Sequence, residues 1–338
     1  MIINVPIESL EERYSKQWNE WFPRVFEELD ELYFCVYPKP LSDKIRDGSF
    51  LDVCATNYFK ANQLAGLCQA LYNGRIHSGD VIFFHDLWFP GLEMLAYIRD
   101  GLGIDFKICG ILHAGTYDPF DFVSKKGMGR WGKNLEESWF SFVDEIFVAT
   151  RYHRDLIYQS RRCRALITVT GLPIYYQDIR GNKYYEKENI VVFPHRLDSE
   201  KQPALFDQLA NILQKKYHDW QFIKTKEVCE TKQQYYDLLG RSKVAVSFAF
   251  QETWGIAQQE ALIFGCIPIV PNRLSYREMY PESLKYEDMD QCIELVERAM
   301  KGDELLQLDS DILFCNLKAA GEEAIPNMVE RMRRWQKA

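Results

Sequence analysis

Two glutamates with a glycine between them form the part of the sequence best suited to chemistry. Glu252 and Glu260 lie eight positions apart, where a predicted strand (244–250) gives way to a predicted helix (256–264). At 3.6 residues per turn, a loop carboxylate and one two turns into the helix can face the same ligand. Backbone N–H groups around Gly255 would point outward at the helix N-terminus, where phosphate binds well. This arrangement predicts a sugar-nucleotide site; the alternative is an ordinary βαβ unit with solvated glutamates.

A second segment brings positive charge to a comparable loop. The apolar run 190–193 is typical of a buried strand, and Arg196 and Lys201 follow it before an amphipathic helix. The apolar positions of that helix are Leu205, Leu209, Ile212 and Leu213. Either cation alone is an ordinary surface charge beside a helix start. Two cations in one strand–helix loop, with paired glutamates in a later one, favour an anion site.

The later segment reads Phe-x-Glu-x-x-Gly-x-x-x-x-Glu-Ala-x-x-x-Gly-x-x-Pro and resembles the donor motif of retaining GT-B glycosyltransferases of the glycogen-synthase-like group (glycosyltransferase family 4-like). The matched positions are Phe250, Glu252, Gly255, Glu260, Ala261, Gly265 and Pro268. The resemblance implies that Glu252 orients the donor sugar and that Glu260 binds the ribose. It also places Thr253, Trp254 and Gly255 in the donor site.

The same resemblance gives Arg196 and Lys201 the task of holding the donor diphosphate, because the family has Gly-Arg-Leu and then a lysine five residues on. His195 stands here where the family usually has glycine. A side chain at that position would keep the backbone further from the phosphate.

The first half of the chain carries two further, less exact matches. In the family, consecutive N-terminal strands end in His-Asp-Trp and in Ile-His-Asn. This chain has His85-Asp86-Leu87-Trp88 and Leu112-His113-Ala114. The resemblance therefore implies a catalytic position for His113, near the donor sugar. The alternative is a structural histidine at a strand end.

Fold class follows from the alternation of apolar runs with helical periodicity, which is typical of α/β proteins with parallel sheets. A length of 338 residues indicates two domains. The resemblance implies GT-B architecture, with two Rossmann-like domains facing each other across a cleft. We expect an acceptor-side domain at 1–170, a hinge at 171–187, a nucleotide-sugar domain at 188–320, and a C-terminal helix at 321–338 that packs back on the first domain.

Composition narrows the cellular setting. The net charge is −8 and 47% of the residues are hydrophobic, so a broadly basic nucleic-acid surface is excluded and well-filled cores are indicated. No apolar run approaches the ~20 residues of a membrane helix. The N-terminus is not that of a signal peptide, and nine cysteines without Cys-x-x-Cys pairs fit a reducing compartment. We expect a cytoplasmic protein without a membrane partner.

Two short segments bear on the acceptor. Residues 12–22 read Glu-Arg-Tyr-Ser-x-Gln-Trp-x-x-Trp-Phe, which looks like the opening of some phage-type glycosyltransferases that act on modified DNA bases; the alternative is an amphipathic first helix with Trp18, Trp21, Phe22 and Val25 in the core. One Gly-rich stretch combines cations with tryptophan: Lys125, Lys126, Arg130, Trp131 and Lys133. A hydroxymethylated DNA base is therefore one expected acceptor, and a glycan or small molecule the other.

The chemistry implied by the family is transfer with retention from a nucleotide-sugar, most simply a UDP-sugar, without a metal or another cofactor. Asp288-Met-Asp290 and Asp309-Ser-Asp311 look like metal-binding Asp-x-Asp signatures of another glycosyltransferase fold. They lie in acidic polar stretches, where helix-cap roles are expected. Two other functions stay open at this point: a GT-B nucleotide-sugar epimerase and a catalytically silent binding protein.

Overall fold

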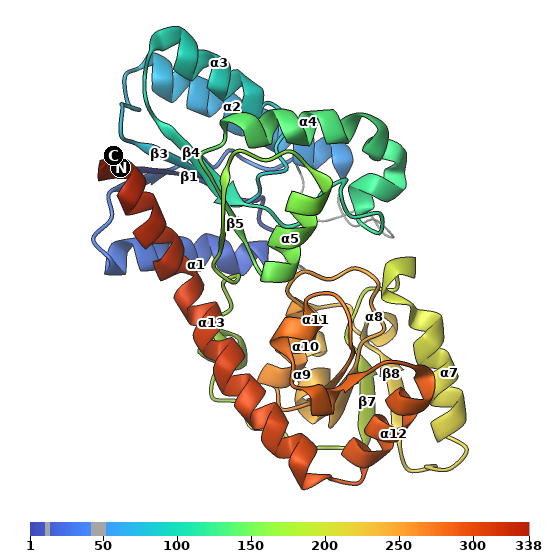
Figure 1. The fold of residues 1–338 in the computed structure, drawn as a ribbon. Helices are drawn as coiled ribbons and strands as arrows, with labels where there is room; N and C mark the ends of the chain where they lie inside the picture. Colours follow the sequence, from blue (N-terminus) through green and yellow to red (C-terminus); the bar gives the residue numbers. More distant parts are fainter. Residues whose placement is uncertain (11–13, 42–51, 338) are drawn as a thin grey trace. The chain divides into compact units, whose positions relative to one another are not determined.

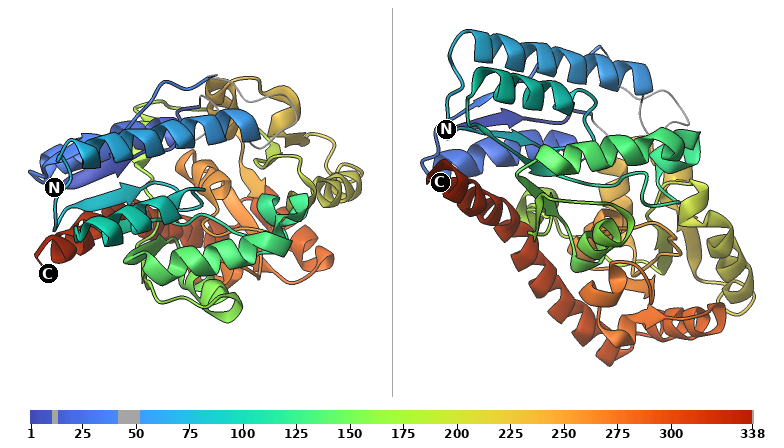
Figure 2. Two further views of the ribbon diagram at one scale, coloured as in Figure 1. Left: turned by 90° about the horizontal axis from the view of Figure 1, so that it is seen from above. Right: turned by 45° about the horizontal axis from the view of Figure 1, so that its top comes forward.

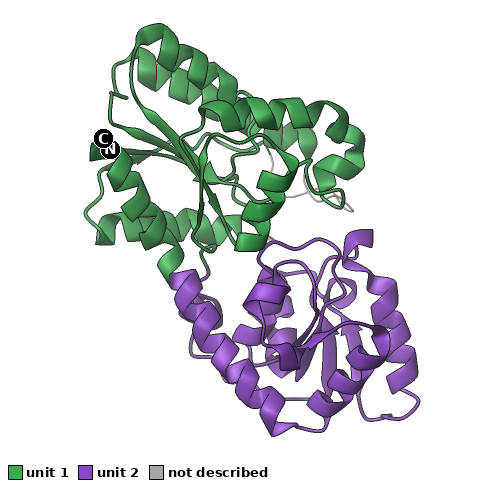
Figure 3. Cartoon of the chain, viewed as in Figure 1, with its two compact units in different colours: residues 1–173, 323–338 green, residues 174–322 purple. Residues whose placement is uncertain are grey.

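The computed structural model describes residues 1–10, 14–41 and 52–337, and these form two compact units. Unit 1 comprises residues 1–173 and 323–338, and unit 2 comprises residues 174–322 (Figure 3). The chain therefore passes between the units twice, once after Pro173 and once after Glu322.

Unit 1 is built on a parallel sheet of six strands in the order β2-β1-β3-β4-β5-β6. The strands are β1 (Ile2–Val5), β2 (Tyr33–Cys35), β3 (Val81–Phe84), β4 (Lys107–Ile111), β5 (Glu145–Val148) and β6 (Leu166–Val169). The central strands are apolar on both faces because helices cover both sides of the sheet. All six strands run in one direction, so the loops that follow them meet at one edge.

Helices α2, α3 and α4 cover one face of this sheet, and α1 and the end of α13 lie on the other (Figures 1 and 2). The helical elements of unit 1 are α1 (Ser15–Glu28), α2 (Val53–Tyr72), α3 (Leu92–Leu102), η1 (Ser124–Met128), α4 (Gly129–Phe142), α5 (Arg151–Ser160) and the last part of α13 (Glu304–Lys337). Inward-facing residues of the strands form one continuous core with α2, α3 and α4.

Helix α1 confirms one of the two interpretations of residues 12–22, an amphipathic helix with its aromatic side chains in the core. Trp18, Trp21, Phe22 and Val25 are all buried in α1. The ring of Phe22 packs 5.4 Å from that of Phe83 in β3, measured between centroids. Glu12 and Arg13, which carry part of the resemblance to DNA-modifying enzymes, lie outside the described residues.

The C-terminal helix α13 is continuous over 34 residues and includes Pro326. Proline has no N–H to donate to the carbonyl four residues earlier, which here belongs to Glu322. The Tyr175 hydroxyl donates to that carbonyl instead, at 3.4 Å. Beyond this point α13 is fixed to unit 1, because Arg331 Nε and Trp335 Nε1 donate to the buried carboxylate of Glu145 at 2.7 and 2.6 Å.

Unit 2 has a second parallel sheet, in the order β11-β10-β9-β7-β8. Its strands are β7 (Ile190–Phe193), β8 (Gln221–Lys224), β9 (Val244–Val246), β10 (Ile267–Pro271) and β11 (Lys285–Tyr286). Its helical elements are α6 (Tyr176–Arg180), η2 (Ser199–Lys201), α7 (Pro203–Leu213), α8 (Thr225–Val228), α9 (Lys232–Arg241), α10 (Ile256–Ile263), α11 (Tyr276–Met279), η3 (Glu282–Leu284), α12 (Met289–Met300) and the first part of α13. Within this unit α6 and α9 pack on α10, and α7 packs on α12.

The structure differs from the sequence prediction in two local features. The predicted strand 244–250 ends at Val246, because the backbone then leaves the sheet and the Phe250 N–H donates to the Glu200 carbonyl at 2.7 Å. The helix after β7 faces the core with Phe206, Leu209 and Leu213, whereas Ile212, expected on the apolar side, is 46% exposed.

None of the helices in the described part of the chain is both long enough and apolar enough to cross a membrane.

Candidate functional site

Two neighbouring loops of unit 2 bring several predicted donor-site residues together. Strands β7 and β9 are adjacent and parallel, so the loops that follow them emerge at the same edge of the sheet. The first loop carries Arg196 and leads into η2, which ends at Lys201. The second loop carries Glu252 and leads into α10, whose N-cap is Gly255. This edge of unit 2 is therefore the candidate functional site.

Glu252 is held in place by the backbone of its own loop. Its Oε1 accepts the N–H groups of Thr253, Trp254 and Gly255 at 3.2, 3.4 and 2.9 Å. The N–H groups around Gly255, expected to point outward toward a phosphate, thus have an acceptor within their own loop. Burial alone would raise the pKa of this carboxyl, but the Lys201 ammonium and the backbone donors outweigh it and lower the pKa from 4.5 to about 2. Glu252 is consequently an ionised acceptor at any physiological pH.

Lys201 is the direct partner of Glu252. Its Nζ lies 3.2 Å from Glu252 Oε2 and also donates to the backbone carbonyl and the side-chain oxygen of Gln251. The two ionic side chains are only 7% and 15% exposed. Removing one member of so buried a pair leaves the other charge uncompensated. Lys201 thus fixes the Glu252 loop as well as supplying positive charge.

The lowered pKa of Glu252 gives a pH prediction. An ordinary glutamate takes up a proton near pH 4.5, whereas folded Glu252 does so at about pH 2. Its stabilising contribution is therefore complete above about pH 4.5 and is lost as the pH falls toward 2. We expect the difference in urea unfolding midpoint between wild type and Glu252→Gln to shrink over that interval. A difference that stays constant from pH 6 to pH 2 would show that the carboxylate is not stabilised as described.

Arg196 lies in the same loop but faces other partners. Its guanidinium contacts Asp198 at 2.7 Å and Glu200 at 3.3 Å, and its side chain is 40% exposed. A diphosphate bound at this edge has to compete with two carboxylates for Arg196. The pair with Asp198 is exposed on both sides and therefore weak, whereas the Glu200 side chain is only 10% exposed, so the guanidinium can leave Asp198 at little cost.

Gly255 gives the donor loop the conformation that α10 requires. Its φ of +73° lies in the left-handed region, and a Cβ there would approach the Tyr276 ring to 3.0 Å. Tyr276 is fully buried and its hydroxyl hydrogen-bonds that of Ser247 at 3.1 Å. Thr253 and Trp254 are also buried, with exposed fractions of 9% and 5%. The inner side of the loop is therefore packed against buried side chains such as Tyr276.

Glu260, predicted to bind the ribose, points toward α9. Lys232 Nζ and Tyr236 OH donate to its Oε1 at 2.6 and 3.0 Å, and Tyr235 OH donates to Oε2 at 3.0 Å. The side chain of Glu260 is 4% exposed. A ribose hydroxyl that binds here must share the carboxylate with these three donors or displace one of them.

His113 belongs to unit 1, where it follows β4 as predicted from the apolar run before it. Its Nε2 lies 2.7 Å from the His85 carbonyl oxygen, and its Nδ1 lies 3.3 Å from the Tyr14 hydroxyl. Burial lowers the pKa of His113, although the Asp86 carboxylate acts in the opposite direction. Its ring also packs 5.3 Å from that of Trp18. These contacts hold a neutral imidazole in a fixed orientation.

A single carboxylate, Glu136 of α4, ties together the two loops that carry the first-half motifs. It accepts from Trp88 Nε1 at 3.1 Å, from the Thr116 backbone at 2.5 Å, and from Arg161 Nε at 2.7 Å. Glu136 and Arg161 form a buried pair, with side chains 1% and 7% exposed. The imperfect His-Asp-Leu-Trp match is therefore still part of an ordered network.

Several contributors to the site gave no recognisable signal in the sequence. Arg273 donates to the Phe248 and Ala249 carbonyls at 2.8 and 3.0 Å and lies over the Phe250 ring, so it clamps the backbone that leads to Glu252. Lys232 and the two tyrosines of α9 reach Glu260 from another strand–helix unit. These contacts depend on the order of the strands in the sheet, which brings the segments together.

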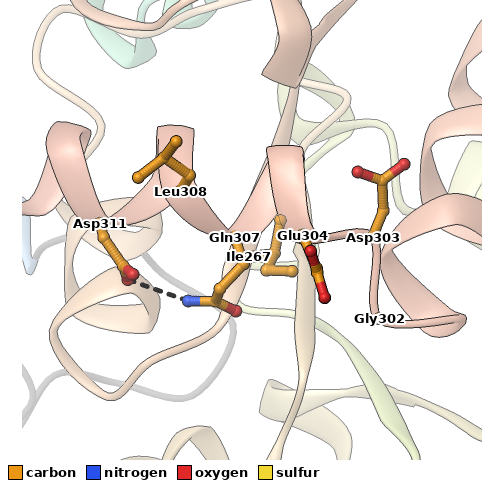
Figure 4. Close-up of a pocket in the computed structure, with 7 residues that line it drawn as sticks. All are labelled: Ile267, Gly302, Asp303, Glu304, Gln307, Leu308 and Asp311. Atoms are coloured by element: carbon orange, nitrogen blue, oxygen red, sulfur yellow. Dashed lines mark hydrogen bonds between the residues drawn. The ribbon is translucent and has the colours of Figure 1, made fainter.

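The Asp-x-Asp segments do not gather as a metal site. Asp288 caps α12 by accepting the Gln291 N–H at 3.0 Å, which confirms its predicted role. The cap role expected of Asp309 and Asp311 is wrong, because both lie inside α13, which begins at Glu304. Asp311 accepts from Gln307 beside a shallow pocket of about 310 Å³ at the start of α13 (Figure 4). That pocket includes Ile267, the first residue of β10, and so lies at the opposite edge of the sheet from the donor loops. Among the described residues, no group of three or more acidic, histidine or cysteine side chains could hold a metal ion.

Comparison with known proteins gives partial sequence relatives and many structural ones. No family model matches the sequence. A tRNA-queuosine alpha-mannosyltransferase of Drosophila melanogaster is 25% identical over 155 residues. The match covers 37% of this chain and 41% of that protein, so the chain spans well under two thirds of the relative.

The solved structures match over much more of the chain, at low identity. Sucrose-phosphate synthase from Thermosynechococcus elongatus has a TM-score of 0.69 at 10% identity and covers 98% of both chains. A UDP-forming trehalose-phosphate synthase from Burkholderia xenovorans has a TM-score of 0.66 at 13% identity and covers 100% of this chain and 99% of its own. S. aureus TarM, solved with UDP, has a TM-score of 0.58 at 14% identity over 82% of this chain and 59% of its own.

Two parallel-sheet α/β units, matched over nearly their full length by these synthases, confirm the predicted fold class: the chain has the GT-B fold.

Proposed function

We propose that this protein is a retaining glycosyltransferase that moves a sugar from a UDP-sugar to a hydroxyl group. The observation that carries the proposal is the buried Lys201–Glu252 pair beside the Gly255 N-cap of α10, at the carboxyl edge of the second sheet of a GT-B fold. The structural relatives support it, because one is a UDP-forming synthase and another was solved with UDP.

The proposed chemistry needs positive potential where the leaving group develops charge. When the bond from the anomeric carbon to the phosphate oxygen breaks, its electron pair stays on the diphosphate. The N-terminus of α10, Arg196 and Lys201 would stabilise that charge, while Glu252 accepts sugar hydroxyls. The acceptor oxygen then bonds to the anomeric carbon on the same face, and its proton passes to the departing phosphate oxygen. A carboxylate nucleophile is not part of this scheme.

The test is incubation of the protein with a panel of nucleotide-sugars and candidate acceptors. Release of UDP together with a glycosylated product supports transfer, whereas an altered sugar still attached to its nucleotide identifies an epimerase. A protein that binds the donor without any turnover would be a binding protein, and that outcome would refute the proposal.

Metal removal gives a separate prediction. We expect turnover to persist in EDTA, because the cations and the helix N-terminus do the work that a divalent ion does at Asp-x-Asp sites. The measurement compares initial rates before and after chelation, and with manganese or magnesium restored. Complete loss that either ion reverses would place the leaving-group chemistry elsewhere.

We further propose a nucleobase-linked hydroxyl in a nucleic acid as the acceptor. Trp131 is 48% exposed, and Lys125, Lys126, Arg130 and Lys133 around it are exposed as well. An exposed indole offers a stacking surface for a base, worth about 1–3 kcal/mol, and the cations suit a phosphate backbone. The partial relative supports this choice, since its name gives a modified tRNA base as its substrate. A hydroxymethylated DNA base has the same reactive group and would have to leave the base stack to react.

The acceptor prediction is measured as transfer to hydroxymethylated duplex DNA and to tRNA across a salt series. Transfer to the true acceptor should fall steeply with salt as phosphate contacts are lost. Joint reversal of Lys125, Lys126 and Arg130 to glutamate should weaken nucleic-acid use and spare donor hydrolysis. Reversal of Lys215, Lys216 and Lys301, exposed cations of unit 2, is the control with the same change in charge; because it also breaks the pairs of Lys216 and Lys301 with Glu297, its stability is compared by urea unfolding. Transfer to a simple glycan but to neither polynucleotide would remove this acceptor class and leave the glycosyltransferase proposal intact.

A further inference from the structure

His195 is a buried histidine in the donor loops to which the proposed mechanism gives no role. It lies two residues after β7, beside Arg196, and only 4% of it is exposed. Its ring packs on Phe193 with a centroid distance of 5.2 Å. Its Nε2 faces the side-chain amide nitrogen of Gln258, in the first turn of α10, at 3.4 Å. The imidazole therefore joins the Arg196 loop to the helix N-terminus of the candidate site.

The contact with Gln258 indicates which ring nitrogen carries the hydrogen. With the amide nitrogen of Gln258 facing the ring, the amide donates and His195 Nε2 accepts with its lone pair. Burial, reinforced by the Lys201 ammonium, lowers the pKa of His195 to about 3, and its ring is neutral at physiological pH. A neutral ring with an accepting Nε2 has its single hydrogen on Nδ1. His195 is consequently a donor at Nδ1.

This donor lacks a protein acceptor. Among the described residues, no hydrogen-bond partner is found for His195 Nδ1. Unlike the unpaired Nδ1 atoms of His85 and His153, His195 Nδ1 is not fully buried, so a ligand can reach it. Two neighbouring atoms, Gln258 Oε1 and Trp254 Nε1, are fully buried without a partner in the described part of the chain, and native structures rarely leave such groups unpaired without a functional reason.

The surroundings of Nδ1 favour an anionic oxygen as the missing acceptor. The cations Arg196 and Lys201 and the first turn of α10 all present positive potential to this loop. Both cations are also paired with carboxylates, so a neutral N–H donor without a partner would add to what they offer an anion. A protonated imidazole would be repelled by Arg196 and Lys201, and a neutral one is not.

We propose that His195 binds the diphosphate of the nucleotide-sugar through its Nδ1–H, as a specific ligand of this chain in addition to Arg196 and Lys201. This inference rests on the proposed function. It makes His195 a residue that distinguishes diphosphate from nucleoside and fixes the leaving group before transfer.

The test compares two substitutions by titration calorimetry with UDP and with uridine, and with GDP and guanosine as the second pair. His195→Phe keeps the ring and its packing on Phe193 but has no nitrogen. His195→Asn loses the ring but places an N–H near the position of Nδ1. One hydrogen bond to a charged acceptor corresponds to roughly a tenfold change in Kd, so we expect His195→Phe to bind the diphosphate about tenfold more weakly. The Asn variant should stay within about threefold of wild type, and no variant should change binding of the nucleoside.

Three other outcomes would contradict the role of His195, and one of them would also contradict the proposed function. Equal diphosphate affinity in wild type and His195→Phe would overturn the inference and leave the proposed function standing. Equal weakening for diphosphate and nucleoside would assign His195 to loop packing and overturn it as well. A wild-type protein that binds neither diphosphate would overturn the proposed function and this inference together. Nitrogen-15 spectra of the wild-type imidazole give an independent readout, since Nδ1 should shift with the diphosphate and not with the nucleoside.

Discussion

Replacing Lys201 by methionine should lower turnover by at least about 100-fold, the scale of losing one charge-stabilising group at a reacting centre. The same change should lower the free energy of unfolding by about 3 kcal/mol, because it leaves the largely buried Glu252 carboxylate without its cation. The fold is thus expected to weaken, whereas the sequence indicated for Lys201 only a role in binding the donor diphosphate.

Arg196→Ala is the matched comparison for that prediction. Arg196 is 40% exposed and its pair with Asp198 is exposed on both sides, so its removal should reduce turnover with a smaller effect on unfolding than Lys201→Met. Initial rates and urea unfolding of both variants separate the two roles. Near-normal rates in both would remove the diphosphate assignment. Unchanged stability in Lys201→Met would instead show that the pair with Glu252 is not formed.

Glu252→Gln should reduce kcat by about 100-fold or more while changing the affinity for UDP less than about threefold. Glutamine keeps the size of the side chain and can still accept the N–H groups of its loop. Its amide nitrogen would replace the oxygen that faces Lys201 Nζ, and the negative charge that orients sugar hydroxyls is gone. UDP has no sugar, so its binding should be spared.

The control for this substitution is Glu227→Gln, an exposed glutamate of the same unit with a side chain 49% exposed. It should leave both kcat and UDP affinity unchanged. If Glu252→Gln weakened UDP binding as strongly as it slowed turnover, Glu252 would be a general support of the loop and the sugar-orienting role would be wrong.

The sequence predicted the fold class correctly because strong local patterns determined it. Short apolar runs separated by helical periodicity require parallel sheets covered on both faces, and the two sheets have that form. The position of Gly255 at the start of a helix was also predicted correctly, and its φ of +73° suits a residue without a Cβ. Such features depend on neighbours in the sequence.

Side-chain contacts between segments far apart in the sequence could not be predicted from it. The three donors around Glu260 come from α9, 24 to 28 residues earlier in the chain. Arg273 reaches back under the donor loop from the end of β10. The sequence shows that His195 replaces the glycine of the family. Its contact with Gln258 is seen only in the folded unit, where the loop after β7 lies beside α10. These contacts are set by strand order, which the sequence does not state.

The central claim is transfer with retention from a UDP-sugar, and anomeric analysis by proton NMR tests it most directly. The protein is incubated with a UDP-sugar of known α configuration and an acceptor, and the anomeric signals are followed from the first turnovers. We expect one UDP released per product formed, and a product with the same α configuration as the donor. A β-configured product, or a changed sugar that remains attached to UDP, would contradict it.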